Sequence, residues 1–489
     1  MLFNSISYAI FLPIVFFLYW FVFQRNLKVQ NIFVVVASYV FYGWWDWRFL
    51  LLIVFTSFST WGFSELMQQI DNKQFTNRLI SRKLLNISNI TINLVILGIF
   101  KYYNFFVDSF VSAFASAGIN IQPHTLQIIL PVGISFYTFQ ALSYSIDVYQ
   151  RKIESTKDMV AFFAFIGFFP LLIAGPIERA KNLLPQFYVP RTFDYVKAVD
   201  GMRQILWGLF KKVVIADNCA EYANMIFNSS GDHSGSTLVL GALFFAVQIY
   251  GDFSGYSDIA IGTARLFGFN AMKNFNYPYF SRDIAEFWRR WHISLSTWFR
   301  DYLYIPLGGS RCSVKKQIRN TFIIFIVSGF WHGSNWTFIV WGAIHACYFL
   351  PLLLSKNNRK NIEIVAKGKT FPSFRELIQI LATFTITVFA WIFFRAESLT
   401  HAVQYVADIF DPTLFSISPI LSIKMCIVFL LVTAFFMMEW LNREKDFALQ
   451  KAETPNKKSL VLRWTLYIAI IACIICLGGS SQDFIYFQF

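Results

Sequence analysis

Three of the six histidines lie in segments where an imidazole is suited to chemistry. His332 stands in SGFWHGSNW, where an apolar run is interrupted; His292 precedes it by 40 residues (332 − 292) and His345 follows it by 13 (345 − 332). Imidazole titrates near neutral pH, so it suits general-base work. We expect His332 to be functional, His292 to be a second candidate and His345 to be structural. The others, His124, His233 and His401, fall in loops or near helix ends.

Polar and aromatic side chains flank His332. Ser328 lies one helical turn before it, Trp331 adjoins it, and Asn335 follows shortly after. A hydroxyl, an indole N–H or an amide at these positions would orient the imidazole or hold an oxyanion, as would backbone N–H groups at a helix break. These three residues are supporting candidates.

The composition predicts a polytopic integral membrane protein. Of the 489 residues, 56% are hydrophobic and only 14% are charged, against roughly 25% charged in soluble domains. Apolar runs recur at Ala9–Phe23, Asn31–Phe41, Leu50–Phe63, Ile90–Phe106, Met159–Ala174, Leu238–Tyr250, Thr321–Phe330, Thr337–Leu354, Leu377–Phe394, Lys424–Trp440 and Trp464–Leu477. At about 20 residues per span, the fold class is all-α with roughly ten to twelve membrane helices. The N-terminus lacks a basic region and a cleavage site, so we expect a retained helix there.

The formal net charge of +14 orients the chain in the membrane rather than pointing to nucleic acid. Basic residues concentrate between apolar runs, at 73–83, 211–212, 311–319, 356–369 and 443–463, as the positive-inside rule predicts for cytoplasmic loops. With the 311–319 and 356–369 loops both inside, the chain between them enters the membrane, turns near His332 and returns. Such a re-entrant break is tolerated only where it is buried in protein or lines a cavity.

The segment Phe275–Gly309 differs in composition from the apolar runs, because it mixes charged residues with aromatic ones. Its apolar positions fall at helical spacing: Phe280, Ile284, Phe287, Trp288, Trp291, Leu295 and Trp298. This pattern predicts an amphipathic helix at the membrane surface or above a polar cavity.

The cysteines predict no metal site. Six are present, mostly inside apolar runs, and the CxxC-like pair Cys473 and Cys476 falls within an apolar helix. Buried cysteines of this kind behave as small hydrophobic residues.

Several long segments together resemble one family. FWRRWHISLSTWFRDYLYIPLGG followed by SGFWHGSNWTFIVWGAIHA is similar to the membrane-bound O-acyltransferase (MBOAT) family, in its bacterial alginate O-acetylation branch. Supporting segments are YGWWDWRFL, PVGISFYTFQALSYSIDVYQ, FFPLLIAGPIERAKNLLPQF and YGDFSGYSDIAIGTARLFGF. We see no internal repeat and no inserted soluble domain, so residues 1–489 are expected to form one transmembrane domain of this type.

The resemblance implies that His332 is the catalytic histidine and His292 a second functional histidine of the same site. It also implies a helical funnel in which cytoplasmic acetyl-CoA, a donor substrate and not a bound cofactor, meets an acceptor from outside. The CoA phosphates need cations, and candidates on the cytoplasmic side are Arg289, Arg290, Arg311, Lys315 and Lys316. Orientation of the chain is the alternative role for these charges.

For two pairs of charged residues the sequence leaves two roles possible, one in a cavity wall and one that is purely structural. Glu178 and Arg179 follow a Gly-Pro break, where they form either a buried pair along the tunnel or a boundary turn. Asp252 and Asp258, in DFSGYSD, present the same choice.

The function these features favour is O-acetylation of an extracytoplasmic polysaccharide, either alginate-like, peptidoglycan or another, by a multi-pass protein of the bacterial inner membrane. Transfer of D-alanine to teichoic acid in the same fold is one alternative, and a transporter or flippase is another. Because the sequence has no secreted hydrolase-like domain, we expect an extracytoplasmic serine-hydrolase-like acetyltransferase as partner.

The C-terminal tail, residues 480–489, is expected to start on the outer side. It ends in SSQDFIYFQF, where Phe484, Tyr486 and Phe489 form an F-x-Y-x-x-F ending that resembles a motif proposed to relay acyl groups in the family. We therefore expect Tyr486 to be a transient acyl carrier. An aromatic anchor among lipid headgroups is the alternative.

Overall fold

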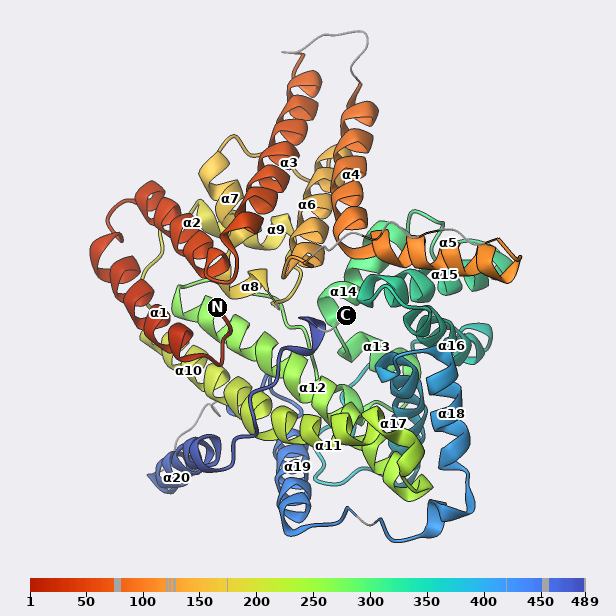
Figure 1. The fold of residues 1–489 in the computed structure, drawn as a ribbon. Coiled ribbons are helices and arrows are strands. Elements are labelled where there is room, and N and C mark those ends of the chain that lie inside the picture. Colours follow the sequence, from red (N-terminus) through yellow and green to blue (C-terminus); the bar gives the residue numbers. More distant parts are fainter. Residues whose placement is uncertain are drawn as a thin grey trace. The chain divides into compact units, whose positions relative to one another are not determined.

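The fold was analysed in a computed structural model, which describes residues 1–73, 81–119, 122, 125, 129–173, 175–418, 420–450 and 457–487. Throughout these described ranges the regular structure is helical and no strand occurs (Figure 1). The predicted all-α class is confirmed.

The chain divides into two compact units. The first unit comprises residues 1–198 and 264–272, and the second comprises residues 199–263 and 273–489. The helices of the first are α1 Ile6–Phe17, α2 Leu27–Gly43, α3 Leu50–Asp71, α4 Arg82–Leu97, α5 Tyr103–Ser116, α6 Ile134–Tyr149, α7 Met159–Gly167, α8 Phe169–Leu172 and α9 Ala180–Leu183. Helix α10, Tyr195–Leu209, begins in the first unit and continues into the second, whereas α12, Gly235–Leu266, begins in the second and ends in the first.

The second unit holds the candidate histidines and the remaining helices. They are α11 Asp217–Asn228, α13 Ile284–Arg290, α14 Ile293–Phe299, α15 Val314–His332, α16 Trp336–Leu354, α17 Phe374–Arg395, α18 Leu399–Ile409, α19 Ile423–Leu441 and α20 Lys457–Cys476. Between α10 and α11 the chain forms a π-helical segment, Phe210–Ala216.

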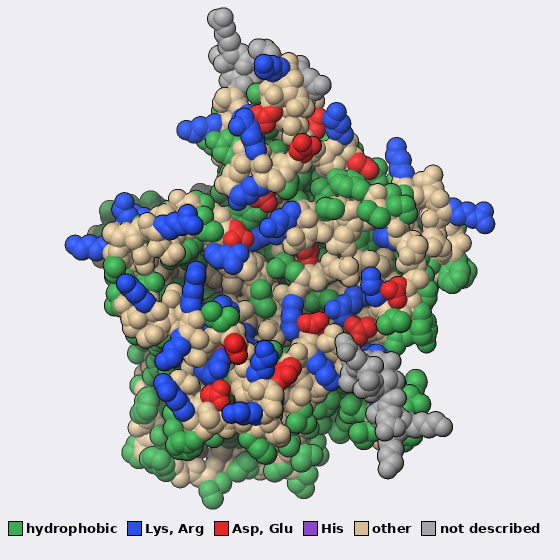
Figure 2. Space-filling model, turned by 180° about the vertical axis from the view of Figure 1, so that it is seen from behind, with side chains coloured by type: hydrophobic (Ala, Val, Ile, Leu, Met, Phe, Trp, Pro, Cys, Tyr) green, Lys and Arg blue, Asp and Glu red, His purple; other side chains and the backbone are tan. Residues whose placement is uncertain are grey.

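Within the ranges that the structure describes, six helices are long and apolar enough to cross a membrane. They span Trp47–Asp71, Arg82–Ser116, Gly235–Leu266, Trp336–Leu354, Phe374–Arg395 and Ile423–Leu441, and shorter apolar helices occupy Ile6–Val22, Leu27–Gly43 and Leu460–Cys476. This confirms a polytopic membrane protein. Among the six, α12 is distinctive, because 83% of its most apolar window is buried inside the protein and so faces protein rather than lipid. Lys and Arg side chains are numerous on the face seen in Figure 2.

In the first unit, polar residues join the helices through their interior. Thr60 on α3 donates to Asn89 on α4 at 3.2 Å, and Ser145 on α6 donates to Asn86 at 3.1 Å. Such interhelical hydrogen bonds are typical of membrane helix packing. The candidate Glu178 is buried here too and accepts the backbone N–H of Met272 at 2.5 Å.

Helices α15 and α16 form a tight hairpin that breaks directly after His332, as predicted. Asn335 caps the second helix by accepting the backbone N–H of Thr337 at 3.1 Å. Two glycines let the helices approach: a Cβ on Gly329 would lie 2.1 Å from the carbonyl oxygen of Phe338, and one on Gly342 would lie 2.2 Å from that of Phe325.

The prediction of an amphipathic helix through Phe280–Trp298 is wrong. The segment folds into α13 and α14, separated at His292, whose φ of +42° is left-handed. The extended stretch before α13 holds this break, because the backbone of Asn274 accepts from Ile293 at 2.8 Å and that of Asn276 donates to Arg290 at 2.9 Å. Helical spacing of apolar residues does not reveal such a turn.

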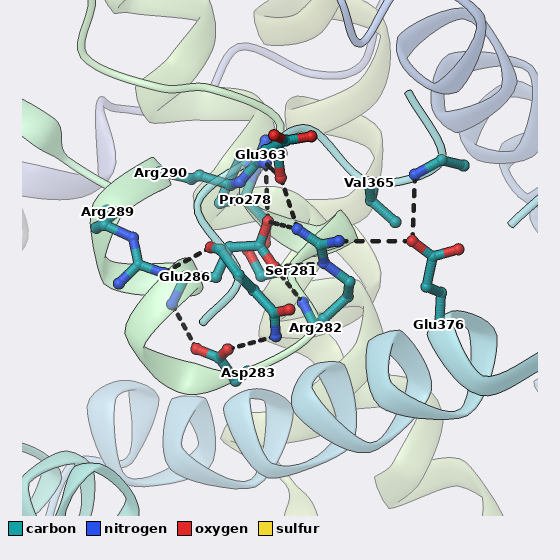
Figure 3. A network of polar contacts seen from close by, with 12 residues as sticks. Pro278, Ser281, Arg282, Asp283, Glu286, Arg289, Arg290, Glu363, Val365 and Glu376 are labelled. Atoms are coloured by element: carbon teal, nitrogen blue, oxygen red, sulfur yellow. Dashed lines mark hydrogen bonds and ion pairs between the residues drawn. The ribbon is translucent and has the colours of Figure 1, made fainter. Parts of the chain in front are cut away.

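Glu286 and Arg290 on α13 are buried within a network of polar contacts (Figure 3). Glu286 pairs with Arg282 at 3.0 Å and with Arg290 at 2.8 Å. Arg282 in turn donates to the backbone oxygen of Glu363 at 2.5 Å and reaches Glu376 on α17 at 3.5 Å. These bonds tie α13 to the segment before α17.

The hairpin contact predicts that Gly329→Ala destabilises the second unit by about 1–3 kcal/mol or more, since the added Cβ would overlap backbone that has no room to move. Thermal unfolding of the detergent-purified protein measures the effect. Gly62→Ala on α3 is the matched control, because a Cβ there meets nothing within 4 Å. Equal thermal stability of the two variants would contradict the proposed constraint.

Candidate functional site

His332, the last residue of α15, is buried among aromatic rings in the second unit. The ring centroids lie at 4.9 Å for Trp331, 5.2 Å for Trp341, 5.2 Å for Phe394 and 5.5 Å for Tyr486. Three of these residues come from α15, α16 and α17, so the hairpin and its neighbour build the pocket together.

His292 is also buried, and its imidazole is oriented by Asn274. The ring Nδ1 lies 3.1 Å from Asn274 Oδ1. The backbone N–H of Ser294 donates to the same oxygen at 3.3 Å, which identifies that atom as the acceptor. Nδ1 of His292 therefore carries the hydrogen, and Nε2 carries the basic lone pair.

Asn274 was missed by the sequence analysis. It lies 18 residues before His292 (292 − 274), and it also donates to Ser257 on α12 at 3.1 Å. Partners of this kind fix the tautomer and the ring direction of a functional histidine. An asparagine within the aromatic sequence NFNYPYF was the available signal, but nothing local linked it to His292.

The C-terminal tail folds back into the second unit and brings Tyr486 to both histidines. The ring centroid of Tyr486 lies 5.5 Å from that of His332 and 6.5 Å from that of His292. Phe253 on α12 packs against the same ring at 4.5 Å, and Trp331 lies at 6.2 Å. The three principal candidates therefore meet at one place. The final residue of the predicted motif, Phe489, lies outside the described residues.

The supporting candidates occupy different positions. Ser328 is buried one turn before His332 on α15, and the Trp331 ring contacts both histidine rings, at 4.9 Å and 5.8 Å. Asn335, besides capping α16, donates its amide to the carbonyl oxygen of Glu397 at 2.8 Å. His345 is buried and accepts from Trp288 Nε1 at 3.3 Å, which fits its structural interpretation.

A cavity of about 480 Å³ lies in the second unit, beside the hairpin. Its lining consists of Trp288, Leu295, Ser296, Phe299, Arg300, Tyr304, Ser310, Gln317, Thr321, Ile324, Phe325, Ser328, Phe349, Leu353, Lys356, Asn358 and Arg359. Ser328 brings this lining to within one helical turn of His332, about 6 Å along the helix axis. Three cations, Arg300, Lys356 and Arg359, belong to this lining.

None of the five predicted donor-binding cations belongs to the lining of this cavity. Arg311, Lys315 and Lys316 are neighbours of lining residues in sequence, between Ser310 and Gln317. Arg289 donates to the backbone oxygens of Asn358 and Asn361, both at 2.7 Å. Arg290 is buried in its ion pair with Glu286.

The two candidate aspartates on α12 are both engaged in ion pairs. Asp258 pairs with Lys211 at 2.5 Å, and Asp252 pairs with Lys212 at 2.9 Å. Within the described parts of the chain no group of three or more His, Cys, Asp and Glu side chains has an arrangement that would hold a metal ion.

The sequence matches the family model for the membrane-bound O-acyltransferase family over residues 149–394. Among its relatives, the probable alginate O-acetylase AlgI of Pseudomonas aeruginosa is 41% identical, covering 82% of this chain and 72% of that protein. The peptidoglycan O-acetyltransferase of Helicobacter pylori is 34% identical, covering 83% and 79%. The teichoic acid D-alanyltransferase of Bacillus subtilis is more distant, at 29% identity over 57% of this chain and 71% of that protein. With this match over half of its length and these relatives over most of it, the chain belongs to the membrane-bound O-acyltransferase family.

Proposed function

We propose that this protein is an O-acetyltransferase of the bacterial inner membrane, which passes acetyl groups from cytoplasmic acetyl-CoA toward an extracytoplasmic polysaccharide. The observation that carries the proposal is the meeting of Tyr486 with His332 and His292 close to the cavity that Ser328 lines. The alginate and peptidoglycan O-acetylating relatives support the same substrate class, and the D-alanyl-transferring relative is more distant.

The proposed chemistry is a histidine-dependent acyl transfer. His332 takes the proton of the acceptor hydroxyl, whose oxygen then attacks the thioester carbonyl carbon. A C–O bond forms, the C–S bond breaks, and the proton passes from His332 to the leaving thiolate. Ser328 and Trp331 supply an O–H and an N–H for the oxyanion. His292, whose ring centroid lies 6.5 Å from that of Tyr486, is proposed to orient the Tyr486 hydroxyl toward His332.

Tyr486 is proposed as the first acceptor. A free phenol has a pKa of about 10, far below that of a sugar alcohol. Burial raises the pKa of Tyr486 well above that value, so in the proposed step His332 takes the proton as the oxygen attacks. The resulting phenyl ester remains activated for a second transfer. The aromatic rings around His332 exclude the water that would hydrolyse it. An extracytoplasmic serine-hydrolase-like partner, docking at the outer side, would take the acetyl group on to the glycan.

The cavity is proposed to hold the donor. Its apolar walls, including Phe325, Phe349 and Leu353, suit the pantetheine arm, while Arg300, Lys356 and Arg359 face the CoA phosphates. The predicted cations Arg311, Lys315 and Lys316 extend the same positive field along the start of α15.

His332→Ala is expected to lower acetyl transfer by about 10²–10⁴-fold, the usual contribution of a general base. Membrane vesicles supplied with labelled acetyl-CoA provide the measurement. His233→Ala serves as control, because the side chain of that loop histidine pairs with Ser229 at 3.1 Å and is not among the residues around His332. Unchanged transfer by a folded His332→Ala protein would refute histidine dependence.

Tyr486→Phe is expected to abolish acetylation of surface glycan while keeping the aromatic packing, since only the hydroxyl is removed. Acid-quenched protein from acetyl-CoA-treated membranes should yield an acetylated C-terminal peptide in the parent but not in this variant, as read by mass spectrometry. Tyr467→Phe on α20 is the matched control. Normal glycan acetylation in cells carrying Tyr486→Phe would make the tail an anchor instead of a relay.

Combined Lys356→Ala and Arg359→Ala are expected to raise KM for acetyl-CoA by about 10–100-fold, because hydrogen bonds to charged groups contribute about 1.5–3 kcal/mol. With S-acetylpantetheine, which lacks the nucleotide phosphates, the parent and the variant should behave alike. Lys367→Ala, an exposed lysine of the same loop, is the control. If KM stays normal in the Lys356→Ala, Arg359→Ala variant but rises when Lys315→Ala and Lys316→Ala are combined, the nucleotide binds at the start of α15 instead.

A further inference from the structure

The C-terminal tail and the residues just before it are held by hydrogen bonds to their backbone, and not only by packing of aromatic rings. Asn218 donates to the carbonyl oxygen of Leu477 at 2.8 Å, and the N–H of Gly479 donates to the carbonyl oxygen of Val213 at 3.0 Å. Further along the tail, Lys212 Nζ donates to the carbonyl oxygen of Gln482 at 2.9 Å. The N–H of Ile485 donates to Asp252 Oδ2 at 2.7 Å. The last of these bonds is one residue from Tyr486.

Three buried charges form the centre of this attachment. Lys212 Nζ lies 2.8 Å from Asp217 Oδ1 and 2.9 Å from Asp252 Oδ1, and all three side chains are 1–3% exposed. Burying such a cluster is expensive, and a well-packed apolar group of similar volume is often as stable. A reason beyond fold stability is therefore needed for its presence, and the tail backbone that it binds supplies one.

The local backbone is shaped for this contact. Lys212 and Val213 belong to the π-helical segment Phe210–Ala216, and π-helical turns inside helices are frequent at functional sites. The tail passes so close to this segment that a Cβ on Gly479 would lie 2.7 Å from the backbone nitrogen of Asn218.

One face of helix α12 provides the remaining contacts to the tail. Asp252 binds the Ile485 N–H, Phe253 packs against Tyr486 at 4.5 Å, and Tyr256 packs against Phe484 at 4.4 Å. Phe484 and Ile485 are fully buried there. The path of the tail is thus fixed up to the Tyr486 ring.

We propose that Lys212, Asp217 and Asp252 are positioning residues, which clamp the tail backbone so that the Tyr486 hydroxyl is presented to His332. The proposal rests on the proposed relay function of Tyr486. Without the clamp, the bonds at Leu477 and Gly479 would still hold the start of the tail, but the residues around Tyr486 would be held by aromatic packing alone. The phenol would then spend less time at the reacting geometry.

Asp252→Asn tests the clamp with almost no change of shape. Asp252 accepts from Lys212 with one oxygen and from Ile485 with the other. An asparagine must turn its NH₂ group toward one of these two donors, so it cannot satisfy both. Ile485→Pro is the second variant, because it deletes the donor N–H while leaving the charge cluster intact. Proline is tolerated at the first position of the short helix Ile485–Phe487.

Hydrogen–deuterium exchange of the C-terminal peptide in the purified full-length protein is the direct readout. Both variants should raise the exchange rate of the tail amides by about tenfold or more. They should lower kcat for acetyl transfer by about tenfold to a hundredfold, the scale of effect of a small misplacement of a reacting group, with KM for acetyl-CoA unchanged. Asp258→Asn is the matched control for exchange, since it breaks a buried lysine pair on the same helix that does not bond the tail.

Unchanged tail exchange in Asp252→Asn and Ile485→Pro would overturn the clamp, even if Tyr486→Phe is inactive. Faster tail exchange with normal transfer would overturn the positioning role. In that case the Tyr486→Phe variant separates the causes: if it too is active, the relay itself has failed, and if it is inactive, the tail is positioned by its aromatic packing.

Discussion

Non-helical backbone inside a membrane protein must find its hydrogen-bond partners within the protein, and three such segments meet around Tyr486. The turn at His292 is bonded by Asn274. After the break at His332, the side chain of Asn335 accepts a backbone N–H of α16. The tail backbone forms hydrogen bonds with Lys212 and Asp252. Each irregular segment directs one side chain, His292, His332 or Tyr486, toward the other two, which a continuous helix would not do. The proposed site exists because all three find internal partners.

Helix α12 is common to two of these segments. Its Asp252 holds the tail, and its Ser257 accepts from Asn274, which orients His292. A helix exposed to lipid is a poor place for such groups, because polar side chains there lack partners. Most of this helix is instead buried in protein, so it can carry aspartate and serine through its middle. The positions of the tail and of His292 are therefore linked through one rigid element.

The second unit separates a polar region from an aromatic one. Arg300, Lys356 and Arg359 contribute charge to the cavity lining, whereas the surroundings of His332 are Trp331, Trp341, Phe394 and Tyr486. Ser328 belongs to the cavity and precedes the histidine by one turn. The proposed acetyl-CoA donor, with its charged end and small acyl end, matches this arrangement. The proposed ester on Tyr486 would lie at the aromatic end, where water is excluded.

The sequence by itself determined the membrane character, the family, the turn after His332, and His332, His292 and Tyr486 as candidates, because composition and short motifs are properties of neighbouring residues. Only the tertiary structure decided the turn that divides α13 from α14, the support of His292 by Asn274, and the cations of the cavity lining. It alone joined Asp252 to Ile485, which are 233 residues apart in the chain. Contacts of that range leave no periodic or local pattern, since they depend on how helices pack and not on spacing along any one helix.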